Sequence, residues 1–140
     1  MNILYPAKIT RDEDDRYLVR FIDIEEGISE GETLEEALFN AQEVLTLSIE
    51  GRMDEKMNVP SPSVIDEDDI YMVAPSAMVQ AALLVRENRK NKLSMAEFAR
   101  MLQTSWPAAS KLENPHNSPT IKMLEKAASV LGKRLIVSFE

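Results

Sequence analysis

The first half of the chain begins with short apolar runs that are separated by polar turns. Residues 3–9 form one apolar run, and residues 17–22 form a second run that is rich in aromatic and β-branched side chains. The charged residues 11–16 between these runs predict a turn that joins two strands. Residues 28–30 lie between two glycines and predict a third short strand.

The pattern changes to helical spacing at Thr33. Its hydroxyl can cap the first turn of a helix, and Glu36, three residues later, completes a capping box. Apolar residues then recur along one helical face at Leu34, Ala37, Leu38, Ala41, Leu45 and Ile49. We expect Gly51 to end this helix, because the prolines at positions 60 and 62 cannot continue one. Residues 70–74 predict one more strand, which closes a small β-β-β-α-β module over residues 1–75.

Beyond Pro75 and Ser76 the apolar positions keep a helical spacing. Ser94 and Glu97 form a second capping box, and Ser105 and Thr120 are further N-cap residues. Helices are expected over residues 77–91, 94–102, 105–112 and 120–131. Alternation over residues 134–139 predicts a short C-terminal strand. The expected fold class is therefore α+β, with one domain at 1–75 and an all-α domain with a β tail at 76–140.

The charge changes sign where the pattern changes. Residues 1–75 contain 6 Lys and Arg against 19 Asp and Glu, a net charge of −13, whereas residues 76–140 contain 10 against 5, a net charge of +5. The net charge of −8 therefore combines an acidic module with a basic one of a size that suits nucleic acid. The chain has no cysteine, which excludes disulfides and thiolate chemistry. We expect a cytoplasmic protein, since no run suits a leader or a membrane span.

Two short helices joined by a turn, residues 94–102 and 105–112, have the organisation of a helix-turn-helix unit. Such a unit needs small residues where its helices cross, which Ala99 supplies, and polar or cationic side chains near the second helix. The candidate DNA-binding residues are Arg100, Ser105, Trp106, Ser110, Lys111 and Asn114. Packing in a core or dimer interface explains Trp106 equally well, and Ser105 is more simply a helix cap.

Residues 93–99, 110–115, 119–124 and 127–132 resemble the XRE/Cro-like helix-turn-helix family. The chain departs from that family at Gln103, where glycine usually starts the turn, and at Trp106 and Pro107, where polar residues usually open the recognition helix. Helix-turn-helix proteins usually bind two half-sites as dimers. We therefore expect a homodimer through the C-terminal domain, with strand 135–139 as a candidate for pairing between subunits.

Residues 5–7, 17–27, 31–37, 40–41 and 60–63 resemble the HicB antitoxin family. The resemblance implies a degenerate ribonuclease-H-like fold that neutralises HicA, a small basic RNA-cleaving toxin, and an antitoxin that represses its own operon. One departure is Glu25-Glu26, where Pro-Gly is usual. A higher hetero-oligomer with the toxin is compatible with this picture.

A toxin that grips RNA presents cations, and an acidic module can cover them by imitating phosphate charge. The candidate toxin-binding carboxylates are Asp12, Asp14, Asp15, Asp23, Glu25, Glu26, Glu30 and Glu32. For any one of them alone, a solvated surface charge is the simpler explanation.

Catalysis is a poor explanation for the same carboxylates. The strand runs 3–9 and 17–22 contain no acid, and the single histidine, His116, lies in a proline-rich loop. We therefore expect no catalytic residue, no metal site and no cofactor. The rival function is a repressor whose acidic domain senses a small ligand or ion, without a toxin partner.

Overall fold

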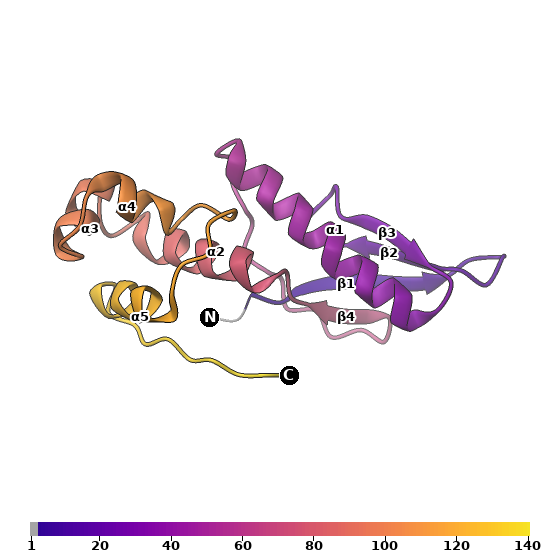
Figure 1. Cartoon of the computed structure of the whole chain (residues 1–140). Helices are drawn as coiled ribbons and strands as arrows, with labels where there is room; N and C mark the ends of the chain where they lie inside the picture. Colours follow the sequence, from indigo (N-terminus) through magenta and orange to yellow (C-terminus); the bar gives the residue numbers. More distant parts are fainter. Residues whose placement is uncertain (1–2) are drawn as a thin grey trace. The chain divides into compact units, whose positions relative to one another are not determined.

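A computed structural model describes residues 3–140 of the chain. The residues up to Val79 form one compact unit, and Gln80–Glu140 form a second. The first unit combines a sheet with one long helix, and the second is helical (Figure 1). The predicted α+β class is confirmed.

The first unit contains a four-stranded antiparallel sheet in the order β3-β2-β1-β4. Its strands are β1 (Tyr5–Arg11), β2 (Tyr17–Phe21), β3 (Ile28–Gly31) and β4 (Ile70–Val73). Alternate side chains of the two central strands are buried on one face, among them Ala7 and Ile9 of β1 and Val19 and Phe21 of β2. Successive side chains of a strand point to opposite faces of the sheet, so every second side chain faces the core.

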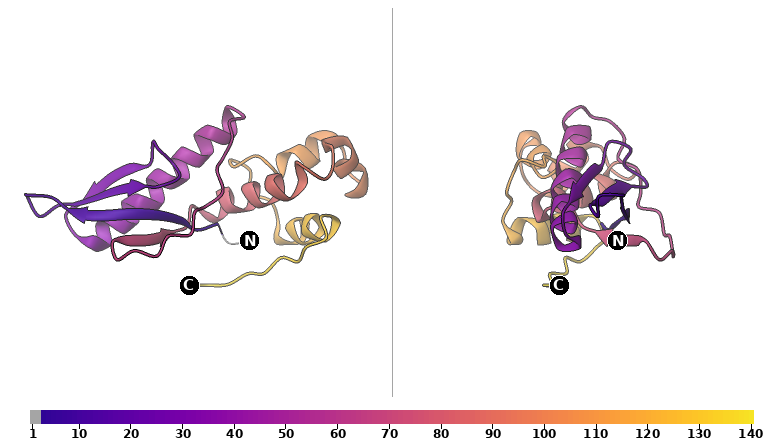
Figure 2. Two further views of the ribbon diagram at one scale, coloured as in Figure 1. Left: turned by 180° about the vertical axis from the view of Figure 1, so that it is seen from behind. Right: turned by 90° about the vertical axis from the view of Figure 1, so that its right-hand side faces the viewer.

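Helix α1 (Leu34–Asp54) packs along that buried face of the sheet (Figures 1 and 2). It contributes a stripe of fully or nearly buried side chains, Ala37, Ala41, Leu45, Ile49 and Met53. The approach is close at Gly31, where a Cβ atom would lie 2.5 Å from the amide nitrogen of Ala37. Glycine at position 31 therefore sets how near β3 can come to the first turn of α1.

The predicted N-cap at Thr33 is confirmed, but the predicted completion of a capping box by Glu36 and the predicted end at Gly51 are wrong. The Thr33 hydroxyl accepts a hydrogen bond from the Glu36 amide at 3.1 Å, whereas the Glu36 carboxylate accepts the amide of Glu32, one residue before the cap, at 3.4 Å. The helix continues through Gly51 to Asp54, because glycine only weakens a helix whose apolar face is buried. It ends where Lys56 adopts a positive φ of 57°.

The second unit is built from α2 (Ala77–Arg89), which begins in the first unit, and from α3 (Met95–Met101), α4 (Trp106–Lys111) and α5 (Ile121–Val130). The Ser94 capping box is present, and Ser105 and Thr120 cap α4 and α5 as predicted. One core cluster joins all four helices through Val85, Phe98, Ala99, Leu102, Ala109, Leu112, Ala127 and Leu131.

A mostly buried ion pair joins Arg89, the last residue of α2, to Glu113, which follows α4. The Arg89 guanidinium donates to both carboxylate oxygens of Glu113, with one nitrogen-to-oxygen distance of 3.0 Å, and to the backbone oxygen of Leu93 at 3.0 Å. Only 16% of the Arg89 side chain and 11% of the Glu113 side chain are exposed. Arg89 therefore holds the core together and is not placed to contact a nucleic acid.

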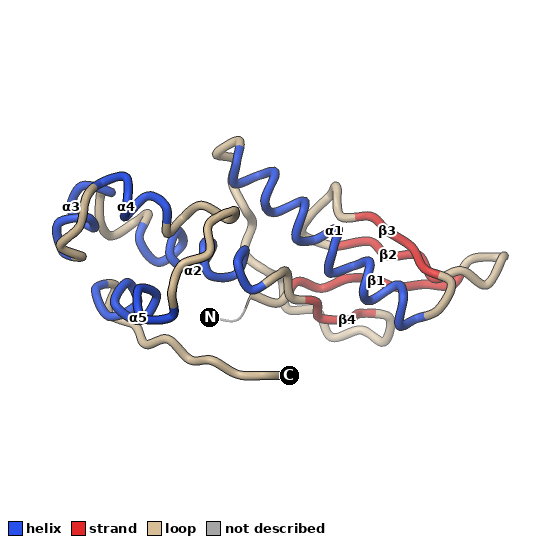
Figure 3. The backbone as a smooth tube through the Cα atoms, in the orientation of Figure 1, coloured by secondary structure: helices blue, strands red, loops and turns tan. Residues whose placement is uncertain are grey.

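The predicted C-terminal strand is wrong for the single chain. Residues 133–140 are extended and irregular, as Figure 3 shows, and they have no strand partner among residues 3–140. A strand is defined by its ladder of hydrogen bonds to a neighbour, which alternation in one sequence does not supply.

Gln103 carries backbone strain in the turn between α3 and α4. Its φ is 57°, the left-handed region, and the amides of Gln103 and Thr104 donate to the backbone oxygens of Arg100 and Ala99, at 3.0 Å each. These two bonds form a Schellman motif, in which glycine is the usual residue at this position. A glycine at position 103 would adopt this backbone geometry without strain.

We expect Gln103→Gly to stabilise the second unit by about 0.5–1 kcal/mol. Relief of left-handed strain contributes about 1–2 kcal/mol, and greater freedom of the unfolded glycine offsets part of it. The measurement is urea unfolding followed by the fluorescence of Trp106, the single tryptophan. The matched control is Gly132→Ala, at a φ of 73° with open space around it, which should lower the midpoint. If the urea midpoint is unchanged in Gln103→Gly but lowered in the control, Gln103 is not strained in the folded protein.

Candidate functional site

The α3 and α4 helices form a helix-turn-helix unit in the second unit of the chain. Phe98 and Ala99 of α3 and Ala109 of α4 are buried in the shared core, so small side chains lie where the helices meet. Pro107 lies in the first turn of α4, where its missing amide breaks no helical hydrogen bond. The exposed start of α4 is thus held rigidly by the packing beneath it.

The sequence-predicted DNA-binding residues differ in what their side chains do. Trp106 is 54% exposed, which excludes it from the core of the single chain. Arg100 and Lys111 are exposed, and Ser110 is half-buried. These side chains come from the end of α3 and from α4.

Ser105 and Asn114, the remaining predicted DNA-binding residues, serve the backbone. The Ser105 hydroxyl accepts the Ala108 amide at 3.2 Å and so caps α4. The Asn114 side-chain oxygen accepts the His116 amide at 2.9 Å and fixes the turn after α4. Both side chains therefore have a local structural role.

The predicted toxin-binding carboxylates divide between two ends of the sheet. The β1–β2 turn, the end of β3 with the start of α1, and the loop before β4 lie at one end (Figure 1). That end holds Asp12, Asp14, Asp15, Glu30 and Glu32, and also Asp66, Glu67, Asp68 and Asp69. Asp23, Glu25 and Glu26 lie at the other end, beyond β2. Five residues of strand separate the two groups by roughly 17 Å, so they do not form one patch.

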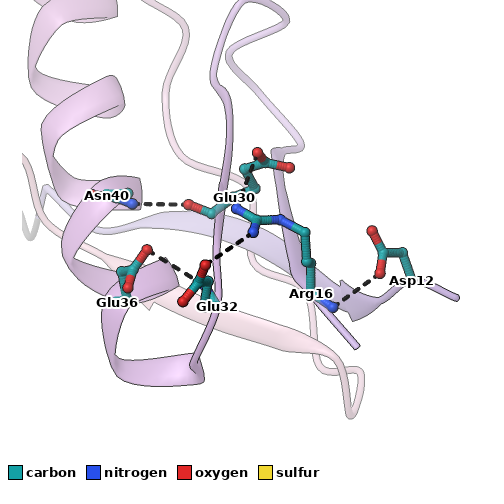
Figure 4. A network of polar contacts seen from close by, with 6 residues as sticks. All are labelled: Asp12, Arg16, Glu30, Glu32, Glu36 and Asn40. Atoms are coloured by element: carbon teal, nitrogen blue, oxygen red, sulfur yellow. Dashed lines mark hydrogen bonds and ion pairs between the residues drawn. The ribbon is translucent and has the colours of Figure 1, made fainter. Parts of the chain in front are cut away.

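Several of these carboxylates stabilise the module itself. Asp12 accepts the amides of Asp14 and Arg16 at 2.8 and 2.9 Å and so shapes the hairpin turn. The Arg16 guanidinium lies 3.2 Å from Glu30 and 3.5 Å from Glu32 (Figure 4). Glu30, the larger influence, raises the pKa of Arg16. Asp15 also pairs, at 3.1 Å, with Arg11.

Two carboxylates at the other end are structural as well. Asp23 accepts the amide and hydroxyl of Ser63 at 2.8 and 2.5 Å, which ties the proline-containing run to the sheet. Glu26 accepts two hydrogen bonds from Arg52, at 2.7 and 2.8 Å, and these lower the pKa of Glu26. Glu25 is exposed.

The outer face of α1 was missed by the sequence reasoning. Phe39 is 62% exposed and Leu47 is 66% exposed, and they lie two turns apart with Glu43 between them. A shallow depression beside them is lined by Gln42, Glu43, Thr46, Leu47 and Ser76. The sequence did contain a signal for this face, because Phe39 and Leu47 are large apolar residues that fall outside the predicted apolar stripe of the helix.

The charged side chains of α1 are negative except for one. The helix carries Glu35, Glu36, Glu43, Glu50 and Asp54, and its single base, Arg52, is paired with Glu26. We call Phe39, Glu43 and Leu47 with these flanking acids the outer α1 surface. It combines large apolar side chains with negative charge alone.

The open face of the sheet, opposite α1, has a different charge. Leu18, Ile28 and Met72 are exposed there, between 40% and 57%. Lys8 and Arg20 lie directly opposite each other on β1 and β2. Because two cations occupy the centre of this face, it suits a basic partner less well than the outer α1 surface does.

Metal chemistry and membrane insertion find no support in the described part of the chain. Residues 3–140 hold no cluster of three or more His, Asp or Glu side chains arranged as metal ligands. Within the same residues, no helix is both long and apolar enough to cross a membrane.

A helix-turn-helix unit following an acidic α+β module defines a DNA-binding regulator that carries a second, separate binding module. Residues 4–82 match the family described as HicB-like antitoxins of bacterial toxin-antitoxin systems, and residues 85–137 match a helix-turn-helix family. Antitoxin HicB of Escherichia coli K12 is 28% identical, over 94% of this chain and 95% of that protein. Antitoxin HicB 2 of Photorhabdus laumondii is 30% identical, over 96% of this chain and 94% of that protein. The chain therefore belongs to the HicB family of antitoxins, and both predicted resemblances are confirmed.

Proposed function

We propose that this antitoxin binds and neutralises a HicA-like RNA-cleaving toxin and represses the operon that encodes both proteins. In this proposal residues 1–75 bind the toxin, and residues 76–140 bind operator DNA and dimerise. The observation that carries it is the joining, in one chain, of an acidic module with a helix-turn-helix unit of opposite net charge. Family membership supports the antitoxin half of the proposal, and the helix-turn-helix unit supports the DNA-binding half.

We place the main toxin contact on the outer α1 surface. A toxin that binds RNA is basic, and the charge of this surface is entirely negative. Exposed Phe39 and Leu47 supply the large apolar anchors that dominate protein interfaces. The acidic end of the sheet, with Asp12, Asp14, Asp15, Glu30 and Glu32, begins where α1 begins and extends the negative surface. Glu25 adds charge at the other end, whereas Asp23 and Glu26 act by holding the fold.

Mixing the antitoxin with the toxin of its operon tests this half of the proposal. We expect a stable complex in which RNA cleavage is suppressed. Absence of a complex, or undiminished cleavage within it, would refute toxin neutralisation and favour the ligand-sensing repressor. Raising the salt concentration should weaken the complex, because the contact is between opposite charges.

We propose that α4 enters the major groove of operator DNA, with Trp106 and Ser110 toward the bases and Lys111 and Arg100 toward phosphates. Exposure of Trp106 and Lys111 at the two ends of α4, and of Arg100 near the end of α3, supports this orientation. Ser105 and Asn114 contribute by fixing the ends of α4, as their hydrogen bonds indicate. Two half-sites about one helical turn apart then require a homodimer.

We expect Lys111→Ala to weaken operator binding by about tenfold and to lower the salt slope by about 1, since one phosphate contact is lost. The measurement is a gel-shift titration on the upstream promoter at several salt concentrations. Lys56→Ala, an exposed lysine of the first unit, is the control and should leave affinity unchanged. Trp106→Ala should weaken binding without changing the salt slope. Unchanged affinity for both Lys111→Ala and Trp106→Ala would remove α4 as the recognition helix.

A further inference from the structure

The open face of the sheet carries two cations side by side. Within the first unit, α1 covers only the opposite face (Figure 2). Lys8 of β1 and Arg20 of β2 are register partners, so their side chains point to the same face, and both are exposed. Like charges directly opposite each other on a sheet repel. The sheet therefore carries two cations at a place where they destabilise it.

The repulsion between these cations is not relieved by acids of the described chain. Within residues 3–140, no ion pair of 4.0 Å or less joins Lys8 or Arg20 to a carboxylate. Glu30, on the same face of β3, is engaged by Arg16 at 3.2 Å. Among the described residues the pair thus lacks an anion, and an anion from outside the chain would stabilise it.

Apolar side chains surround the two cations. Ile28 of β3 lies directly beside Arg20, and Ile70 of β4 lies directly beside Lys8. A depression of about 560 Å³ lies on this face, and its lining includes Lys8, Thr10, Leu18, Arg20, Ile28 and Glu30. The open face therefore offers positive charge at its centre and apolar contact around it.

The dimensions of the open face suit one helix. Four strands about 4.8 Å apart span about 14 Å, and the five residues of β2 span about 17 Å. A helix is about 10 Å wide and rises about 5.4 Å per turn, so about three turns cover the face. A sheet buries an apolar face by packing against another layer, as it does against α1 on the other side.

We propose that the open face binds an amphipathic helix of an acidic partner protein, with a carboxylate of its apolar stripe between Lys8 and Arg20. The carboxylate accepts charge-assisted hydrogen bonds from both cations and removes their repulsion. Leu18, Ile28 and Met72 contact the apolar residues that flank the carboxylate. This site goes beyond the proposed function, because the same two cations repel a basic toxin.

A nucleic acid suits the open face less well than an acidic helix does. Acidic residues bound the sheet at both ends, at 12–15 in the β1–β2 turn and at 25–26 beyond β2. A polyanion that crossed the face would meet these carboxylates, whereas a single carboxylate on a helix would not. The exposed side chains of Leu18, Ile28 and Met72 are also not aromatic, so they offer no platform on which bases stack.

Two synthetic amphipathic helical peptides test the site. Their sequences are identical except that one has Glu and the other Gln in the middle of the apolar stripe. We expect the full-length antitoxin to bind the Glu peptide about tenfold more tightly than the Gln peptide, as measured by fluorescence anisotropy. Equal affinity for the two peptides, or binding of neither, would overturn the proposal.

Variants of the antitoxin locate the contact. Lys8→Gln with Arg20→Gln should abolish the preference for the Glu peptide and leave the affinity for the Gln peptide unchanged, a result that a misfolded protein would not give. Lys56→Gln, which removes an exposed cation after α1, is the matched control and should keep the tenfold preference. A preference that survives in the double variant, or disappears in the control, would place the peptide elsewhere and overturn the proposal.

Other occupants of the open face give different outcomes. A short single-stranded RNA should not displace the Glu peptide, and displacement by it would assign the face to nucleic acid. Sedimentation of the wild type and of Lys8→Gln with Arg20→Gln should agree, and loss of self-association in the variant would assign the face to a second copy of the chain. Either of these results would overturn the acidic partner.

Failure of this site and failure of the proposed function are distinguishable. Saturating toxin should leave the affinity for the Glu peptide unchanged, because α1 and the open face lie on opposite sides of the sheet, and displacement by the toxin would overturn the proposal. If wild-type protein inhibits the toxin but binds neither peptide, the site is wrong and the proposed function stands. If it prefers the Glu peptide but does not bind the toxin, the site stands and the antitoxin function falls.

Discussion

We expect the double replacement of Phe39 and Leu47 with serine to lower the affinity of the antitoxin for the proposed toxin by about 100-fold, because aromatic and aliphatic anchors contribute about 1–3 kcal/mol each when they are buried in an interface. Both side chains are more than half exposed in the free chain. The stability of the antitoxin should therefore change by no more than about 0.5 kcal/mol. Isothermal titration calorimetry with the toxin measures the affinity, and an RNA cleavage assay measures the inhibition.

The open face of the sheet provides a matched control for that pair. Leu18→Ser with Ile28→Ser removes two exposed apolar side chains from the same module, but beside Lys8 and Arg20. We expect this variant to retain toxin binding. If the control loses binding and the Phe39 and Leu47 variant keeps it, the toxin contact lies on the sheet face and the assignment to α1 is wrong. Operator binding should be unchanged in both variants.

The second large effect is expected from Arg89→Ala, which leaves the carboxylate of Glu113 buried without its partner. Breaking a mostly buried ion pair in this way costs about 3–5 kcal/mol. A unit of this size has a total stability of only about 3–9 kcal/mol, so the variant should be largely unfolded in its second unit at 37 °C. Urea unfolding followed by Trp106 fluorescence gives the change in free energy.

Two further variants test whether the loss of stability comes from the buried Arg89–Glu113 pair or from the removal of any positive charge. Lys122→Ala removes an exposed charge from α5 in the same unit and should cost no more than about 0.5 kcal/mol. Arg89→Met with Glu113→Leu removes both charges and should recover most of the loss, since apolar side chains tolerate burial. An Arg89→Ala protein as stable as wild type would show that Glu113 finds another partner. Toxin inhibition, which belongs to the first unit in our proposal, should survive in Arg89→Ala.

Local signals in the sequence predicted most of the elements correctly. Thr33, Ser94, Ser105 and Thr120 were all identified as helix caps, and each accepts the expected backbone amide. A capping hydroxyl acts on an amide only a few residues away, so the sequence contains both partners. The apolar run 3–9 and the aromatic and β-branched residues of 17–22 likewise predicted the first strands, because side chains of these kinds favour a half-buried strand.

Interactions between distant residues could not be predicted in the same way. The hydrogen bonds of Asp23 to Ser63 and of Glu26 to Arg52 join residues 40 and 26 positions apart. The sequence therefore did not show that Asp23 and Glu26 hold the fold, nor that the sheet divides the acidic set between two ends. Residues 133–140 show the same limit, because an alternating pattern does not tell whether the chain offers a strand partner.

The candidate DNA-binding residues lie on or beside the two helices that the sequence predicted, and their contacts with DNA stay a prediction. Lys111 and Trp106 are exposed on α4, as expected of a recognition helix. Gln103 occupies the position where glycine usually starts the turn of a helix-turn-helix unit. Its positive φ shows that the turn keeps its shape, with backbone strain at Gln103.

The run between α1 and β4 also bears on how long the antitoxin persists in a cell. Tyr5 and Asp23 hold its first part, through Pro60 at 2.7 Å and through Ser63, but Val64 is 99% exposed and residues 66–69 are exposed as well. Proteases cut most readily at exposed irregular chain of this kind. One cut there would disconnect β4, an edge strand, from the helix that carries the outer α1 surface. The lifetime of toxin inhibition would then be set by a single peptide segment, while the helix-turn-helix unit remained intact.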